Sequence, residues 1–440
     1  MGRITINNNL KINGKISLLS NDFSNQWYGI EINEANTSPD LTRVAGTGYM
    51  SYHATLPIHN LIKGCILNDN GTVNYYLDPT NWDLKSTGGA SKLNGDDGQV
   101  MMEWQNFYYR VVYSTPTIYQ IRISLNPIAG YTLVSKHYIS AYESTTKSGA
   151  TIYMASVKNN TVAYRGGNGT VAYDAQDNTL LGMPRTNYNR TNGRIRARNR
   201  GTGWNLYGYN DHKWLFWLFA IEYATLNSQK AVDPTLTVEG YKKGGLGNGV
   251  TTANTTEWSN FNGYNPFIAC GASDSLLNGS GEVSVTKTNF GGAGVNRTFY
   301  ANRYRGHENP FGHIWKMCDG INLKVSASIS EVYTADNPAN WNDSNYTNYN
   351  NKGLYSRSNG YMSIALIGDN AEFIAKVAAG ANNTYYCDYF YQSNVLGLYM
   401  LLVGGSASTG TIAGFVCSVT NGAPSDADTH FGSRFRFSAA

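Results

Sequence analysis

The chain has 440 residues, of which 41% are hydrophobic and 13% aromatic, whereas only 15% are charged. An aromatic-rich chain with so little charge buries a large core, which excludes bulk disorder, and the lack of sustained heptads excludes a coiled-coil rod. The 34 basic and 30 acidic residues leave a net charge of +4, too small to indicate a nucleic acid or another polyanion as partner. The 47 glycines and 33 tyrosines are typical of turn-rich β proteins of virions and extracellular surfaces.

The N-terminal region carries polar, alternating segments and no apolar stretch of the kind found in secretory signal peptides. No run approaches the roughly 18 apolar residues of a membrane helix. We therefore expect a protein that is made in a cytoplasm, has no signal peptide and does not insert into membranes. Residues 1–30 are interpreted as an N-terminal arm, serving either as an attachment segment or as a plain edge hairpin.

Residues 31–150 are predicted to form a β-rich domain. The segments 107–113 and 117–123 are enriched in aromatic and β-branched residues, and a Ser-Thr-Pro turn joins them. This pattern predicts two half-buried strands of one hairpin.

Residues 159–205 are polar and rich in arginine. The spacing of Arg194, Arg196 and Arg198 places three guanidinium groups on one face of an extended segment. A nucleic-acid-binding stripe is one interpretation. We favour arginines that tie loops together through carbonyls and carboxylates, because the rest of the chain is nearly neutral.

One strong helix is predicted over residues 212–224, with Asp211 as its cap. The segment is apolar nearly all round, so the helix must be buried on most sides. Residues 240–263 are expected to be loop, 341–351 an exposed polar loop, and 431–437 a closing strand. Residues 151–440 are therefore predicted to form a second domain.

The five cysteines include no CxxC pair, so neither a disulfide framework nor a zinc knuckle is indicated. His307 and His313 flank Glu308, but Pro310 and Gly312 forbid the helix that HExxH metal ligation requires. We expect no metal, no cofactor and buried structural thiols.

Two resemblances to known proteins emerge from motifs in chain order. Segments 198–204, 214–224, 308–315 and 432–434 are similar to the formylglycine-generating-enzyme-like branch of the C-type-lectin-like fold. Segments 38–43, 56–58, 97–101, 138–143 and 304–309 resemble more closely a family of virion proteins from tailed phages of gut bacteria, the crAss-like phages of Bacteroidales. This second resemblance covers residues 25–440.

The resemblances imply an α+β fold in which an N-terminal β-rich region precedes a C-type-lectin-like domain with a buried central helix and many loops. Its motif residues are expected to be structural. They are Arg200, Trp204, Trp214, Glu222, Arg305, Glu308, Asn309, Trp315 and Arg434.

The resemblance to phage proteins implies a non-enzymatic head or tail fibre, or a capsid decoration protein, that binds host surface glycans. Other virion proteins, a host surface glycan or protein, and a homotrimeric state are the expected partners. Two alternatives stay open. One is an enzyme on the same fold, either a polysaccharide depolymerase or a formylglycine-type oxidase. The other is a purely structural virion component that anchors or decorates other fibres.

A tyrosine-rich segment, residues 382–394, is the candidate ligand-binding site. Tyrosine offers a flat face for sugar C–H groups together with a hydroxyl, and amides and carboxylates bind sugar hydroxyls. A half-buried strand with alternate tyrosines packed inward is the competing interpretation. The candidate residues are Tyr385, Tyr386, Asp388, Tyr389, Tyr391 and Asn394.

A depolymerase would need two carboxylates converging on the sugar, for which Asp97, Glu143, Asp319 and Glu331 are candidates. An oxidase would need a close thiolate pair, whereas Cys387 and Cys417 are thirty residues apart.

Overall fold

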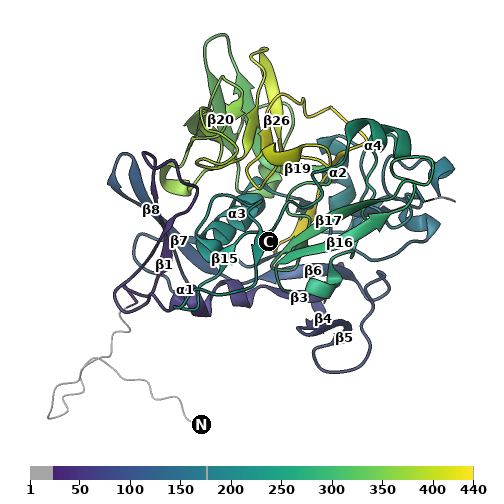
Figure 1. Ribbon diagram of the computed structural model, residues 1–440, viewed down its shortest axis with the longest axis horizontal. Coiled ribbons are helices and arrows are strands. Elements are labelled where there is room, and N and C mark those ends of the chain that lie inside the picture. Colours follow the sequence, from purple (N-terminus) through teal and green to yellow (C-terminus); the bar gives the residue numbers. More distant parts are fainter. Residues whose placement is uncertain (1–22, 175–176, 440) are drawn as a thin grey trace.

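The computed structural model describes residues 23–174 and 177–439 and shows a strand-rich α+β protein (Figure 1). The predicted α+β class is confirmed. Most of the predicted N-terminal arm, residues 1–22, lies outside the described residues. Among the residues described, no helix combines the length and apolarity needed to cross a membrane.

Two antiparallel sheets use mainly strands from the first third of the chain. The five-stranded sheet has the order β2-β1-β8-β7-β9, and the seven-stranded sheet has the order β13-β29-β10-β6-β3-β4-β5. The first sheet comprises β1 (Tyr28–Asn33), β2 (Thr42–Ala45), β7 (Phe107–Thr115), β8 (Ile118–Ser124) and β9 (Thr132–Val134). The second comprises β3 (Lys63–Leu67), β4 (Val73–Asp78), β5 (Asn81–Lys85), β6 (Gln99–Trp104), β10 (His137–Ser140), β13 (Trp204–Leu206) and β29 (Phe435–Phe437). The predicted hairpin is confirmed as β7 and β8, which pair Tyr113 with Tyr119.

A third large sheet is built from the last third of the chain. Its order is β21-β20-β19-β26-β27-β25-β22, with β28 parallel to the start of β19. Its strands are β19 (Trp315–Val325), β20 (Ser330–Thr334), β21 (Asn350–Leu354), β22 (Gly360–Tyr361), β25 (Tyr389–Tyr391), β26 (Gly397–Val403), β27 (Ser418–Val419) and β28 (Phe431–Gly432). The predicted closing strand is thus two strands in two sheets, because β28 and β29 are separated by Ser433 and Arg434.

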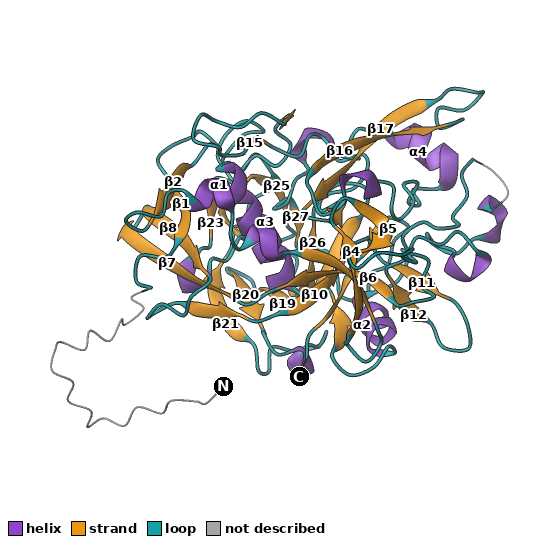
Figure 2. Ribbon diagram, turned by 90° about the horizontal axis from the view of Figure 1, so that it is seen from below, coloured by secondary structure: helices purple, strands orange, loops and turns teal. Residues whose placement is uncertain are grey.

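Four small sheets complete the strand structure. In the sheet β16-β17-β18, strands β16 and β17 form a long hairpin that extends from the body of the molecule (Figure 2). Its strands are β16 (Gly281–Lys287), β17 (Arg297–Tyr304) and β18 (His307–Glu308). The two-stranded sheets pair β11 (Thr145–Lys147) with β12 (Tyr153–Ala155), β14 (Val232–Asp233) with β15 (Lys243–Gly244), and β23 (Ile364–Ala365) with β24 (Ala375–Val377).

The α-helices are α1 (Tyr52–Thr55), α2 (Arg190–Arg198), α3 (Tyr209–Tyr223) and α4 (Thr255–Asn262). Helix α3 is the predicted buried helix, and it lies centrally in both views (Figures 1 and 2). It begins at Tyr209, so Asp211 lies within its first turn rather than before it. The Asp211 carboxylate accepts a hydrogen bond from the Gly208 backbone N–H at 2.8 Å and so still stabilises the helix start.

Helix α3 joins the two predicted domains in one core. The centroid of the Trp214 ring lies 5.4 Å from that of Phe107 and 4.4 Å from that of Tyr109, both on β7. On the other side, Phe219 packs 5.2 Å from Phe415. In addition, β10 pairs with both β6 and the C-terminal strand β29. The boundary predicted at residues 150 and 151 therefore does not separate two sheets or two cores.

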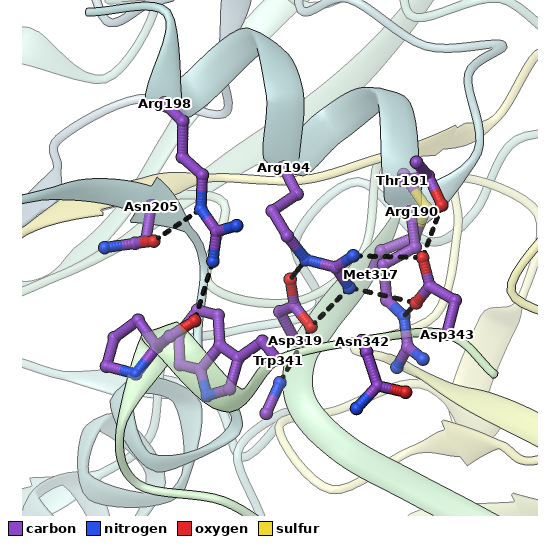
Figure 3. Close-up of polar contacts among 12 residues, drawn as sticks. Arg190, Thr191, Arg194, Arg198, Asn205, Met317, Asp319, Trp341, Asn342 and Asp343 are labelled. Carbon is purple, nitrogen blue, oxygen red and sulfur yellow. Dashed lines mark hydrogen bonds and ion pairs between the residues drawn. The ribbon is translucent and has the colours of Figure 1, made fainter. Parts of the chain in front are cut away.

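The arginine-rich segment predicted as extended is helix α2, which corrects that prediction. Arg190, Arg194 and Arg198 are four residues apart and share one helix face. They reach Asp343, Asp319 and Asn205 respectively (Figure 3). Of the three arginines predicted to share a face, Arg194 and Arg198 are structural ties, as expected, whereas Arg196 makes no hydrogen bond or ion pair with any residue described.

Two predicted loops also differ from the structure. The segment 240–263 contains helix α4. The side chain of Asn254 caps the start of this helix. The segment 341–351 is only partly exposed, since Trp341 and Tyr349 are buried and the Trp341 ring N–H donates to the Ala335 carbonyl at 2.7 Å. Both segments are polar in composition, so their sequences give little indication of the parts that are buried.

Candidate functional site

The centre of the predicted ligand-binding segment is strand β25. Tyr389 and Tyr391 are half-buried and share one face of the strand, whereas Phe390 between them is fully buried. This alternation is that of a strand with one face in the core. Both tyrosines therefore present part of their rings to solvent.

Two of the predicted ligand-binding residues are buried, and the structure removes them from the candidate site. Tyr386 is 2% exposed and Asp388 is 1% exposed. The Asp388 carboxylate accepts a hydrogen bond from the Val416 backbone N–H at 2.8 Å. Tyr386 and Asp388 alternate with the buried Phe390, so both lie on the inward side of the segment.

Tyr385 and Asn394 are not buried, but they lie apart from the β25 tyrosines. Tyr385 lines a different, small cavity together with Tyr386, Asp40 and Tyr119. Asn394 is exposed, and its side-chain amide donates to the Arg357 carbonyl at 3.2 Å. The predicted set therefore divides into three places, and only Tyr389 and Tyr391 stay together.

A third tyrosine, which the sequence did not single out, extends this pair into a row. Tyr361 on β22 is the register partner of Tyr389, and their ring centroids are 5.2 Å apart. The Tyr389 and Tyr391 centroids are 4.5 Å apart. We call Tyr361, Tyr389 and Tyr391 the tyrosine row.

The tyrosine row leads into an open depression of about 300 Å³, which we call the aromatic pocket. Tyr391 pairs with Val419 on β27, and both line the depression together with Trp315 at the start of β19. Trp315 was predicted as a purely structural residue, yet it lines this pocket. The lining residues are Trp315, Tyr391, Ser408, Thr409, Ile412, Val419 and Asn421.

Two of the three polar side chains that line the aromatic pocket are available to a ligand, whereas the Thr409 hydroxyl is engaged by Ser406. The side chains of Ser408 and Asn421 make no hydrogen bond with any residue that the structure describes. Burial raises the pKa of Tyr391 to about 12, so its hydroxyl remains a hydrogen-bond donor at neutral pH. Two aromatic rings beside free hydroxyl and amide groups match the chemistry of a sugar, which has apolar C–H faces and hydroxyl edges.

The remaining motif residues lie in the interior. Glu222 accepts two hydrogen bonds from Arg305, at 2.8 and 2.6 Å, and one from the Tyr304 hydroxyl at 3.0 Å. Glu308 accepts from the backbone N–H groups of Gly271 and Ser273 at 2.9 and 2.7 Å. All of these interactions hold loops onto the core.

Four further motif residues also serve packing or backbone contacts. Arg434 donates to the carbonyls of Ser140, Ala141 and Glu308. The Trp204 ring N–H donates to the Asp69 carbonyl at 2.7 Å, and Arg200 pairs with the Asp69 carboxylate. Asn309 takes up the left-handed backbone conformation in the turn after β18, where its N–H donates to the Asn302 carbonyl.

Three of the four carboxylates considered for hydrolysis are engaged in ion pairs, each with a different partner. Glu143 and Asp319 are buried in ion pairs with Lys316 and Arg194. Glu331 pairs with Lys324. Asp97, in contrast, lines an open polar groove of about 650 Å³ together with Asp69, Asp96 and Arg200.

All five thiols are buried and free. Burial raises the pKa of Cys387 to about 12, and it also raises the pKa of Cys417. Protonated thiols are poor metal ligands. Over residues 23–174 and 177–439 the structure also contains no cluster of three His, Cys, Asp or Glu side chains able to hold a metal ion.

No protein-family model matches the chain, and neither does any curated protein. Among solved structures, the chain is similar to PvdO from Pseudomonas aeruginosa, with 12% identity over 78% of this chain and 96% of that one and a TM-score of 0.29. It is also similar to the I1 and P3c variants of a Major Tropism Determinant, with 12% and 13% identity over 75% of this chain and 71% of theirs. The TM-scores of these two are 0.20 and 0.21. These values assign no function to the chain.

Proposed function

We propose that this chain is a virion protein of a phage that attaches to host surface glycans without cleaving them, through the tyrosine row and the aromatic pocket. The observation that carries the proposal is the run of partly exposed rings from Tyr361 to Tyr391 that ends beside Trp315. The motif resemblance to virion proteins of gut-bacterial phages supports the same function. On the same resemblance we propose a C-type-lectin-like fold, a homotrimeric state and contacts with other virion proteins.

The geometry fits an extended sugar chain better than a compact small molecule. The pocket is shallow, and the tyrosine row continues away from it across β25 and β22. Aromatic rings spaced at 4.5 and 5.2 Å offer successive contacts to neighbouring sugar rings. Affinity then comes from several weak contacts rather than from one deep cavity.

The experiment incubates purified protein with intact host-like bacteria and with their stripped capsular polysaccharide, and follows polymer length in the same tube. Saturable binding with unchanged polymer length is the expected result. No binding to either preparation would contradict attachment and favour a purely structural virion component.

A second candidate function, polysaccharide depolymerase, is favoured by one observation. The polar groove brings Asp69, Asp96 and Asp97 together with Tyr153 and Tyr164. Paired carboxylates in an open groove are what glycoside hydrolysis requires. Shortened polymer in the same experiment would identify this activity, and Asp97→Asn is then expected to abolish the shortening.

A further inference from the structure

Arg196 on helix α2 and the nearby Arg185 lack the partners that the other arginines of the helix have. Arg190, Arg194 and Arg198 are held by carboxylates, amides and carbonyls on one face (Figure 3). Arg196 lies two residues from Arg194, roughly 200° around the helix, and so points to the opposite side. Its guanidinium lies 4.9 Å from the centroid of the Tyr188 ring.

Arg196 has an unsatisfied hydrogen-bonding group in this position. It makes no hydrogen bond or ion pair with any residue that the structure describes. Its Nη1 atom is buried without a partner, as is the Tyr188 hydroxyl. Unpartnered buried donors are costly and indicate a missing acceptor.

Arg185 lies on the other side of Tyr188 in sequence and is likewise unpartnered within the described part of the chain. Its guanidinium lies over Gly169, where even a Cβ atom would come within 2.3 Å of Nη1. A glycine with φ +85° therefore makes room for this side chain. The nearby Arg165 is neutralised by Asp174, so that carboxylate is already engaged.

The electrostatics of the pair are unfavourable without a counter-ion. Burial and the neighbouring Arg196 lower the pKa of Arg185 to about 10. Burial raises the pKa of Tyr188, and the two neighbouring arginines offset this rise only in part. Partly buried like charges with no acidic partner are stabilised by an anion that binds between them.

We propose that Arg185 and Arg196, together with the Tyr188 hydroxyl, form a binding site for an oxyanion group: a carboxylate, sulfate or phosphate. Guanidinium groups present paired N–H donors that match two oxygens of such a group. The site is distinct from the aromatic pocket, which has no charged lining residue. It gives the protein a means to bind an acidic polysaccharide or a free inorganic anion.

The experiment measures thermal unfolding and calorimetric binding of the full chain with inorganic sulfate and phosphate, against chloride at equal ionic strength. The variants are Arg185→Gln, Arg196→Gln and, as control, Arg110→Gln, an exposed arginine on β7. We expect sulfate or phosphate to bind the wild type and the control, and to bind each site variant at least tenfold more weakly. In chloride alone, the site variants should unfold at the same or a higher temperature, because a repulsion is removed.

An equal rise of the unfolding temperature in all four proteins would be a general salt effect and would overturn the proposal. A second arm compares oligogalacturonates with neutral dextran oligomers of the same length. Arginine-dependent binding of the oligogalacturonates identifies a polysaccharide as the source of the anion, whereas binding of inorganic anions alone identifies a free ion. Failure of both probes contradicts the site while leaving glycan binding at the tyrosine row unaffected.

Discussion

At the residue scale, burial decides which of the candidate side chains are available to a ligand. Tyr389 and Tyr391 are separated by one buried residue and face solvent, whereas Asp388 lies in the interior within the same short segment. Composition alone cannot distinguish these positions, because it does not say which of the two alternating sides of the segment faces the core. A carboxylate in a tyrosine-rich stretch therefore resembles a sugar ligand in sequence and is a core residue in the structure.

Asp388→Asn tests this distinction. Burial raises the pKa of Asp388 well above its ordinary value, and the hydrogen bond from Val416 lowers it only partly. A raised folded-state pKa means that Asp388 contributes stability below about pH 4, which is lost as the pH rises toward the folded-state pKa. The neutral amide does not titrate. We expect the unfolding temperature of the variant to rise relative to that of the wild type as the pH increases above about 4, while glycan binding stays unchanged.

The measurement for Asp388→Asn is thermal unfolding at several pH values, with polysaccharide binding measured at pH 7. Loss of binding without loss of stability would show that Asp388 contacts the ligand after all. A constant difference in unfolding temperature across the pH range would contradict the raised pKa.

At the element scale, helix α2 is held by ion pairs rather than by an apolar face. Arg194 donates to the fully buried Asp319 at 2.6 and 2.9 Å, and Asp343 bridges Arg190 and Arg194. Asp319→Asn leaves a buried guanidinium partly unpaired, and we expect the free energy of unfolding to fall by about 3 kcal/mol.

The matched control is Asp40→Asn, which removes an ion pair with Lys230 in which both side chains are about half exposed. We expect that change to cost less than about 1 kcal/mol. Denaturant unfolding of the two variants measures the difference directly. Equal, small losses would show that the α2 contacts seen in Figure 3 do not stabilise the fold.

The elements that sequence could predict are those with a strong apolar signal. Helix α3 is apolar on all sides, and the β7–β8 hairpin alternates aromatic and polar residues, so both were predicted correctly. Helix α2 was not, because its stability depends on partners distant in sequence, and neither was α4, a short helix in a polar segment. Asp319 and Asp343 hold α2 from more than a hundred residues away. The pairing of Trp315 with Tyr391 around one pocket was missed for the same reason.

At the scale of the whole molecule, the two main hydrophobic clusters each draw residues from both sides of the predicted domain boundary. Strand β10 lies between β6 and the C-terminal strand β29, and α3 packs on β7. The fragment 23–150 lacks α3 and β29 and therefore exposes the faces that they cover. We expect this fragment to show no cooperative unfolding transition by circular dichroism, whereas the full chain shows one. Cooperative unfolding of the fragment would restore the predicted domain boundary.

The central claim is that the tyrosine row and the aromatic pocket bind a host glycan. The most direct measurement is the affinity of the variant Tyr389→Ala/Tyr391→Ala for stripped host polysaccharide, beside the control Tyr300→Ala. Tyr300 is 43% exposed on β17, outside the sheet that carries the site. Removing two ring faces is predicted to weaken binding at least about tenfold, which corresponds to about 1.4 kcal/mol, while the control binds like the wild type. Unchanged affinity in a folded double variant would contradict the account.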